Sequence, residues 1–445
     1  MCIMGETGKL SRRQFVQSAA VASAVSGAPA VWAKQNPGKV IGVASIGVGT
    51  KGYRNLVAAQ DVPNTEIRVI CDLYDGNIER AKKLCTNPNV RVIKEWERVL
   101  EQPDIDAVII STPDFWHAPM TIKAAEAGKD IYVEKGWCVT LQEAKDMRRA
   151  VKTNNVVMQL GHHYNSSATY HRAREIFRSG VLGKVPMVRT FIDRTGTVPQ
   201  WIFYTDYNIS KAPEDAGPST IDWDRFLDNA PKRDFDINRF FTWRRFWDYG
   251  TGLAGDLMSH LWDGVNMVMG MGIPETMVTQ GGIYFWQDDR EVPDMWHTIM
   301  DYPKQDLAIS FGACTHSVHV GEMTHILGRE KTLEVSPQFC RVYDGEWKPE
   351  ARQKKAKAQD MASQLGLQRQ DAVIPPDYSM DRNSDIEPTS HMHNFLDCVR
   401  TRALLRCGVD RAFEEAATIV MSIEAFKRNA KVRWDAEREE IVNAG

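Results

Sequence analysis

The sequence has no excess of charge of either sign. Its 445 residues include 55 Lys and Arg against 58 Asp and Glu, a formal net charge of −3. A protein that binds a nucleic-acid backbone needs a basic surface, so we expect no nucleic-acid partner. Apolar residues make up 43% and charged residues 25%, which is ordinary for globular domains and excludes a disordered or collagen-like chain.

Long apolar runs and metal-type cysteine spacings are also missing. No run after the N-terminal segment reaches the roughly 20 apolar residues of a membrane helix, so we expect no membrane contact after processing. The 8 cysteines include no C-x-x-C pair, which speaks against a zinc site. His162 and His163 are neighbours, but adjacent side chains point apart and no acidic or histidine partner is spaced to join them. We therefore expect no metal site.

Residues 1–33 are predicted to be a twin-arginine export signal. Arg12 and Arg13 stand in the pattern S-R-R-Q-F-V, and a short apolar stretch of small residues follows. Val31 and Ala33 have the small side chains that a signal peptidase accepts. The alternative is a cytosolic amphipathic helix. Because twin-arginine signals carry folded proteins, we expect a periplasmic or secreted protein that leaves the cytoplasm with its cofactor already bound.

Residues 38–161 are predicted to form a doubly wound α/β domain that binds a dinucleotide. The apolar run 40–46 leads into G-V-G-T-K-G and then into a helical stretch, and strands and helices alternate from there. Gly47 allows a tight turn, Gly49 lets the backbone approach a pyrophosphate, and Gly52 lets helix and strand pack closely.

Asp72 ends the second predicted strand, 20 residues after Gly52. A carboxylate there would accept hydrogen bonds from the ribose hydroxyls of NAD and repel the 2′-phosphate of NADP. The sequence therefore favours NAD over NADP.

The residues after the later strands are further candidates, because cofactors of parallel sheets lie at the carboxyl ends of the strands. Lys135 follows one strand and could hold or polarise a substrate hydroxyl. The predicted cofactor-binding residues are Gly47, Val48, Gly49, Lys51, Gly52, Asp72, Thr112, Pro113, His117, Glu134 and Lys135. The predicted substrate contacts are Trp137, His162, His163, Tyr164, Asn165 and Trp243.

The motifs IGVGTKG, ICD, STPDFWHAP, YVEKG, SGVLGKV and HNFLDCVR occur in the order and spacing of one family. They resemble the glucose-fructose oxidoreductase / inositol dehydrogenase / MocA (Gfo/Idh/MocA) family. The resemblance implies a Rossmann domain followed by an α/β domain with a large, mostly antiparallel open sheet. It also implies a bound NAD(P), oxidation or reduction of a carbinol on a sugar or polyol, and a homo-oligomer, a dimer or tetramer.

The resemblance also implies the catalytic residues. Lys135 matches the family's E-K-P lysine, and Asp256 and His260 match its D-x-x-x-H pair. His260 would exchange the hydroxyl proton while Asp256 positions the substrate. Independently of the family, Asp256 and His260 are four residues apart on a predicted helix and share a face. The chain departs from the family at Gly136, where the family has proline, and at residues 162–165, where many members have an Arg-rich loop.

Residues 162–445 are predicted to form the substrate-binding and oligomerisation domain. The stretch 201–245 is rich in aromatic residues, Trp243 among them, which could stack on sugar rings or pack against the sheet. Alternating runs such as 277–285 and 295–302 suggest antiparallel strands, and 347–389 is predicted to be a polar excursion.

Three functions remain open from the sequence. The favoured one is an NAD-dependent oxidoreductase for a sugar or glycoside, with a tightly bound cofactor that is recycled on the enzyme. The alternative is a redox-assisted glycoside hydrolase, which oxidises C3 of the sugar, eliminates the aglycone, adds water and reduces the sugar again. The third is a sugar-binding relative that has lost its chemistry.

Overall fold

The computed structural model describes residues 38–196, 198–202, 211–228, 230–318, 321–344, 378–381 and 390–444. The predicted export signal and most of the predicted polar excursion lie outside these residues.

The predicted doubly wound parallel sheet of the N-terminal unit is confirmed, and it has six strands in the order β3-β2-β1-β4-β5-β6. All six residues of β1 are buried, because a parallel sheet covered on both faces needs apolar side chains in both directions. The strands are β1 Ile41–Ile46, β2 Thr65–Cys71, β3 Arg91–Val92, β4 Ala107–Ile110, β5 Asp130–Val133 and β6 Met158–Leu160.

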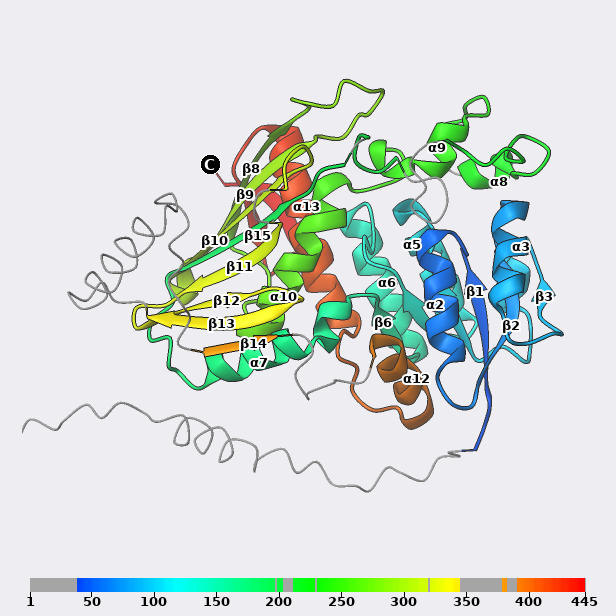
Figure 1. The fold of residues 1–445 in the computed structure, drawn as a ribbon, viewed down its shortest axis with the longest axis horizontal. Coiled ribbons are helices and arrows are strands. Elements are labelled where there is room, and N and C mark those ends of the chain that lie inside the picture. The colour runs from blue at the N-terminus through cyan, green and yellow to red at the C-terminus, as the bar shows by residue number, and fades with distance from the viewer. Residues whose placement is uncertain are drawn as a thin grey trace, which may run out of the picture.

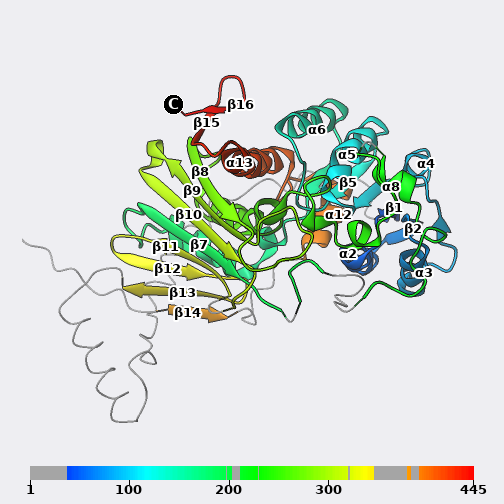
Figure 2. The ribbon, with the colours of Figure 1, turned by 90° about the horizontal axis from the view of Figure 1, so that it is seen from above.

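Helices cover both faces of this sheet (Figure 2). One face packs against α2 (Thr50–Gln60), α3 (Asp75–Leu84) and α12 (His391–Thr401) through side chains such as Leu56 and Phe395. The opposite face packs against α4 (Trp96–Leu100), α5 (His117–Glu126), α6 (Leu141–Asn154) and the first part of α13 (Val409–Arg428). A helix from the C-terminal end of the chain therefore completes each of the two cores of the N-terminal sheet.

The second unit is built on a sheet of ten strands in the order β14-β13-β12-β11-β7-β10-β9-β8-β15-β16. The pairing of β7 with β10 is parallel, while the other pairings are antiparallel, so the predicted mostly antiparallel sheet is confirmed. β14 lies within the predicted excursion. The strands are β7 Met187–Asp193, β8 Thr276–Gly282, β9 Met295–Tyr302, β10 Leu307–Cys314, β11 Glu322–Leu327, β12 Lys331–Val335, β13 Phe339–Asp344, β14 Tyr378–Asp381, β15 Val432–Asp435 and β16 Glu440–Asn443.

One face of the ten-stranded sheet carries α7 (Ala168–Arg178), α10 (Ser259–Met269) and α13. Its opposite face carries none of the helices in the described ranges, as Figure 2 shows. None of the described helices is long and apolar enough to cross a membrane.

The segment between β7 and α10 extends over the N-terminal unit. It carries α8 (Trp223–Leu227) and α9 (Ile237–Phe241), which lie above α3 and α5 in Figure 1. The indole of Trp116 donates a hydrogen bond to the carbonyl of Phe226, and Ile221 pairs with Tyr74 through a β-bridge. These contacts bring second-domain residues to the carboxyl ends of the parallel strands.

Candidate active site

A cavity of about 390 Å³ lies where the two units meet. Its floor is formed by residues that follow β1, β2, β4 and β5, and its wall by second-domain residues. Predicted residues that line it are Gly47, Gly49, Lys51, Asp72, Thr112, Pro113, Glu134, Lys135, His163, Trp243, Asp256 and His260.

The glycine loop fits a dinucleotide pyrophosphate. Gly47 has a φ of +76°, and a Cβ at Gly52 would lie 1.9 Å from the Gly47 carbonyl oxygen. These glycines therefore let the loop turn tightly and let α2 pack against it. The N-cap of α2, Gly49, has no side-chain cap, so the free N–H groups at this helix end are available to an anion. Val48 is buried and does not line the cavity.

Asp72 holds the glycine loop in place. Its Oδ2 accepts a hydrogen bond from Val48 N at 2.7 Å, and its Oδ1 accepts one from Tyr74 N at 2.9 Å. Burial raises the pKa of this carboxyl, and the two backbone donors partly offset that effect. Asp72 is 8% exposed and lines the cavity.

Glu134 and Lys51 form a pair on the cofactor side of the cavity. Lys51 Nζ lies 3.4 Å from Glu134 Oε1, and Asn55 donates a hydrogen bond of 2.9 Å to the same oxygen. Burial alone would raise the pKa of Glu134, but the Lys51 charge and the Asn55 hydrogen bond outweigh it and lower the pKa. Glu134 is therefore a carboxylate at neutral pH.

The loop that presents Lys135 has a backbone that proline cannot adopt. Gly136 has a φ of +74°, whereas the proline ring holds φ near −65°. A Cβ at Gly136 would lie 2.5 Å from Oδ1 of the buried Asp114, which accepts hydrogen bonds from the amide and hydroxyl of Thr251. The departure from the family motif therefore changes the local backbone that carries Lys135.

His117 was predicted to bind the cofactor, but the structure buries it outside the cavity. Its Nδ1 lies 2.8 Å from the Gly136 carbonyl oxygen and its Nε2 lies 3.0 Å from the Thr112 carbonyl oxygen. Both ring nitrogens thus face backbone carbonyls, and His117 connects the loop after β4 to the lysine loop.

Asp256 is the carboxylate on which the charges of the site converge. Lys135 Nζ donates to Asp256 Oδ1 at 2.5 Å and to its carbonyl oxygen at 2.7 Å. Trp201 Nε1 donates to Oδ2 at 2.7 Å, and Arg244 Nε lies 3.4 Å from Oδ1. Burial opposes ionisation, but the Lys135 and Arg244 charges outweigh it and hold the pKa of Asp256 well below its usual value.

The segment that carries Asp256 is a π-helical turn, Ala254–Met258, rather than the predicted regular helix. Such turns occur often at functional sites. Trp201, which binds Asp256, is buried and has a φ of +71°, a conformation that costs energy for a bulky side chain. The carboxylate of Asp256 is thus placed by a π-helical turn and bound by a residue with a strained backbone.

His260 lies at the start of α10 among other aromatic rings. The ring centroids of His162, His163 and Tyr164 are 5.2, 5.3 and 5.1 Å from it. Burial, followed by the Lys135 charge, lowers the pKa of His260 well below its usual value. Burial and the Lys51 charge lower the pKa of His163 to about 3. Both imidazoles are therefore neutral at neutral pH.

Four predicted substrate contacts do not reach the cavity. Trp137 is 2% exposed within the core, and the hydroxyl of Tyr164 donates to Glu322. His162 is fully buried, and Asn165 donates to Asp263 Oδ2 at 2.5 Å. Trp137 packs into the core after β5, and the loop after β6 turns three of its side chains inward, so that only His163 of residues 162–165 lines the cavity.

His162 belongs to a buried cluster of charged residues that lie far apart in the sequence. Its Nε2 lies 2.7 Å from Glu415 Oε2, and its Nδ1 lies 3.8 Å from Asp263 Oδ2. The premise that no acidic partner joins His162 is thus wrong, because α10 and α13 bring these partners from far along the chain. Arg411 lies 2.8 Å from Asp263 Oδ1. A guanidinium already occupies this carboxylate and would repel a metal cation, so the cluster fits a buried ion network better than a metal site.

Several cavity residues were missing from the predicted site, among them Arg194, Gln200, Trp201 and Arg244. Arg194 directly follows β7, so inspecting the end of the strand that enters the second domain would have found it. Gln200, Trp201 and Arg244 lie in an irregular segment without a strand or motif to mark them.

The fold and the cavity define an NAD-binding oxidoreductase, and comparison with known proteins agrees. A family described as "Oxidoreductase family, NAD-binding Rossmann fold" matches residues 41–162, and its C-terminal alpha/beta domain matches residues 174–433. The chain therefore belongs to the Gfo/Idh/MocA family of NAD(P)-dependent oxidoreductases.

Individual relatives are distant. A scyllo-inositol 2-dehydrogenase (NAD(+)) from Bacillus subtilis (strain 168) is 30% identical over 234 residues, which are 48% of this chain and 65% of the relative. A glycosyl hydrolase family 109 protein from Shewanella sp. (strain MR-4) is 29% identical over 33% of this chain and 34% of its own. The matched stretches thus span under two thirds of either relative. A solved levoglucosan dehydrogenase in complex with NADH and levoglucosan has a TM-score of 0.63 at 16% identity and covers 88% of this chain and 99% of its own.

Proposed function

We propose that this protein is an NAD-dependent dehydrogenase that acts on a carbinol of a sugar or glycoside. The observation that carries the proposal is that Lys135, Asp256 and His260 line the same cavity as the glycine loop. A group bound along that loop therefore shares its space with a cation, a carboxylate and a neutral imidazole. Bound NAD would supply the acceptor for the hydride that leaves the carbinol carbon.

Three side chains of the cavity would control the transfer of the proton from the substrate hydroxyl. His260 is neutral at neutral pH and can accept the hydroxyl proton as the carbon–hydrogen bond breaks. Lys135 is held by two hydrogen bonds to Asp256 and has one further N–H to offer to the substrate oxygen. Asp256 holds Lys135 in place, so the substrate hydroxyl would lie between a fixed donor and a base.

The cofactor is proposed to be NAD rather than NADP. The supporting residue is Asp72, whose carboxylate lines the cavity on the cofactor side and would repel a 2′-phosphate. Arg80, on the helix that follows Asp72, is directed to the Val48 carbonyl oxygen at 3.3 Å and to the Asn77 side chain at 3.2 Å.

We also propose that the protein is exported with its cofactor bound. Free NAD is scarce outside the cytoplasm, so the cofactor would be regenerated on the enzyme by a second sugar. The supporting observation is the twin-arginine pattern at Arg12 and Arg13.

The second candidate is a redox-assisted glycoside hydrolase. It is favoured by His163, a neutral imidazole whose ring lies 5.3 Å from that of His260 and which lines the cavity. Such a reaction needs a second base near the sugar, and a glycosyl hydrolase family 109 protein is among the relatives.

One experiment separates the two functions. Protein purified with its bound nucleotide is incubated with a panel of nitrophenyl glycosides, with and without a sugar acceptor. A dehydrogenase reduces the bound nucleotide and needs the acceptor to turn over. Release of aglycone without acceptor and without NADH accumulation contradicts the dehydrogenase and supports the hydrolase, and the absence of any bound or bindable nucleotide contradicts both.

The proposed roles of Lys135 and His260 are tested with alanine variants and a surface control. Lys135→Ala and His260→Ala should each lower turnover at least about a hundredfold, as expected for loss of a positioned acid–base group. Lys123→Ala, which changes a 62% exposed lysine on α5, should leave turnover unchanged. Full activity in either cavity variant would overturn the assignment.

We further propose a homo-oligomer that forms through the face of the ten-stranded sheet that carries none of the described helices. Val278, Ile299 and Phe285 are 38%, 54% and 53% exposed in and beside β8 and β9. Exposed apolar side chains of this kind favour association.

A further inference from the structure

Six cations line the cavity, and five of them have an acid within ion-pair distance. Lys51 faces Glu134, Lys94 faces Asp75 at 2.5 Å, and Arg225 faces Glu97 at 3.1 Å. Lys135 and Arg244 share Asp256. Arg194 is different, because it has no ion pair and no side-chain hydrogen bond with any residue in the described ranges of the chain.

Arg194 is nevertheless fixed in place at the reaction end of the cavity. It directly follows β7, and its backbone N–H donates to the Cys314 carbonyl at the end of β10 at 3.0 Å. Its charge acts on both Asp256 and His260, so it lies within electrostatic reach of the two catalytic candidates. Glu322, which also feels the charge of Arg194, is bonded to the Tyr164 hydroxyl and does not line the cavity.

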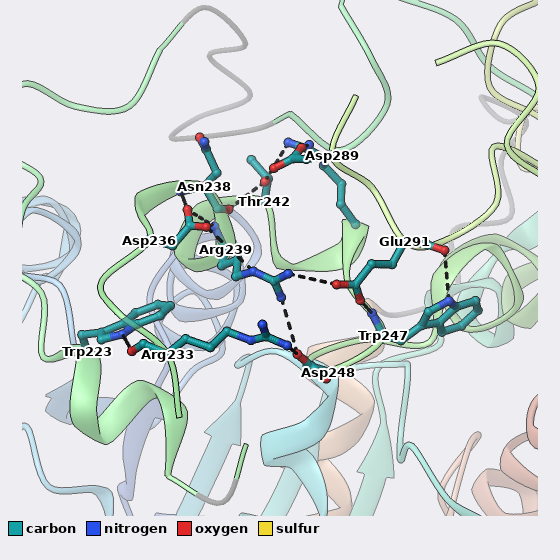
Figure 3. A network of polar contacts seen from close by, with 11 residues as sticks. Trp223, Arg233, Asp236, Asn238, Arg239, Thr242, Trp247, Asp248, Asp289 and Glu291 are labelled. Carbon is teal, nitrogen blue, oxygen red and sulfur yellow. Dashed lines mark hydrogen bonds and ion pairs between the residues drawn. The ribbon is translucent and has the colours of Figure 1, made fainter. Parts of the chain in front are cut away.

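Arg244 approaches the same region from a segment that ion pairs and a ring contact hold in place. Its guanidinium carbon lies 4.1 Å from the centre of the Trp243 ring, which also lines the cavity. Figure 3 shows the polar network around this segment, in which Arg239 bonds Glu291 at 2.9 Å and Arg233 bonds Asp248 at 2.7 Å. The first pair ties the segment to the loop that carries Glu291, and the second joins two parts of the segment itself, so Arg244 presents its charge without a large loss of conformational entropy.

Three cations at the reaction end, Lys135, Arg194 and Arg244, act on Asp256, and the buried carboxyl of Asp114 also lines the cavity near Lys135 and Arg244. A half-buried guanidinium without a partner among the described residues costs desolvation energy that a bound anion would return. A neutral sugar offers only hydroxyl groups and leaves that charge unbalanced.

We infer that the substrate is an anionic sugar, one that carries an acidic group such as the carboxylate of a uronic or aldonic acid, and that Arg194 binds this group with help from Arg244. This inference rests on the proposed dehydrogenase function and names its substrate class. A guanidinium can donate two parallel hydrogen bonds to a carboxylate, which fixes the orientation of the sugar relative to Lys135 and His260.

The test compares matched acidic and neutral sugars on the protein loaded with NADH. Calorimetric titration with D-glucuronate, D-glucose and D-glucose 6-phosphate, and with D-galacturonate against D-galactose, measures affinity without requiring turnover. An acidic sugar should bind about ten- to a hundredfold more tightly than its neutral partner, the range for a hydrogen bond to a charged group. The uronate and phosphate arms identify which acidic group the site takes.

Arg194→Gln should abolish the preference for the acidic sugar, and Arg194→Lys should restore part of it. The NAD-loaded variants should show the loss in KM more than in kcat, because the binding of a remote group is removed. Arg149→Gln, which changes a 72% exposed arginine on α6, is the matched control and should keep the preference. Thermal unfolding of each variant identifies any that has failed to fold.

Equal affinity for acidic and neutral sugars, or an unchanged ratio in Arg194→Gln, would overturn the inference. Failure of the proposed function looks different: an acidic sugar would bind in an Arg194-dependent manner, yet no sugar would change the redox state of the bound nucleotide.

Discussion

Trp201 shows how single residues shape this site. It is a buried aromatic residue with a φ of +71° that lines the cavity, and its indole donates a hydrogen bond of 2.7 Å to Asp256. A strained backbone of this kind persists only when the surrounding contacts hold it in place. Here the indole and Lys135 hold the two oxygens of the same carboxylate.

Trp201→Phe should therefore lower kcat/KM of the proposed reaction about tenfold or more, because a hydrogen bond to a charged group contributes roughly 1.5–3 kcal/mol. The variant should keep its bound nucleotide, because Trp201 contacts Asp256 and lies far from the glycine loop in the sequence. Trp296→Phe is the control, because the Trp296 indole donates to Ser422 within the core. Steady-state kinetics on both variants would check this, and equal losses in the two would contradict the role of Trp201.

At the scale of elements, the loop after β5 is the clearest departure from the family pattern. Its backbone at Gly136 is left-handed, and the carboxylate of Asp114 occupies the space that a side chain would need. Asp114 is in turn bonded to Thr251, just before the π-helical turn that carries Asp256. The glycine thus belongs to a set of contacts that aligns the two domains at the site.

We expect Gly136→Ala to destabilise the protein more than Gly128→Ala. Gly128 has a similar φ of +69°, but a Cβ there would meet nothing within 4 Å, so both changes carry the left-handed strain and only Gly136→Ala adds a clash. The strain costs about 1 kcal/mol in each variant. Gly136→Pro, which restores the family motif, should lose activity as well. Thermal unfolding and kinetics measure these effects, and a Gly136→Pro variant with normal turnover would refute the account.

At the scale of the whole molecule, residues from the last part of the chain belong to the core of the N-terminal unit. α12 comes from the last part of the chain, yet Phe395 and Leu396 complete the core beneath β1 and α2. His391, at the start of α12, lies 2.7 Å from the Leu160 carbonyl oxygen at the end of β6 and 3.0 Å from the Ser166 hydroxyl. The C-terminal part of the chain is therefore needed for the N-terminal sheet to bury its apolar face.

His391 also predicts a pH effect on the whole fold. Burial lowers its pKa from 6.5 to about 4, so the unfolded chain binds a proton that the folded chain excludes between these values. Stability is therefore lost as the pH falls from about 6.5 to about 4, and one such histidine contributes roughly 3 kcal/mol. His391→Gln should make the fall in melting temperature over this range shallower. His316→Gln, a change of an exposed histidine, should leave the slope unchanged, and identical slopes for the two variants would contradict the prediction.

The residue patterns of the chain were sufficient for the order of the elements. Alternation of strands with helices predicted the doubly wound α/β domain, and G-V-G-T-K-G predicted the loop where α2 begins. These features are local, because strand burial, helix periodicity and glycine turns depend on residues close together in sequence. The positions of Lys135, Asp256 and His260 at one cavity follow from the family motifs.

Tertiary structure decided which side chains reach that cavity. His162 and His163 are adjacent, yet the first is buried against Glu415 and the second lines the cavity. Arg194 joins the site from the end of β7, and Trp201 and Arg244 join it from the long segment between β7 and α10. The physical reason is that burial, ion pairing and desolvation depend on residues from distant strands and helices, which no local pattern in the sequence brings together.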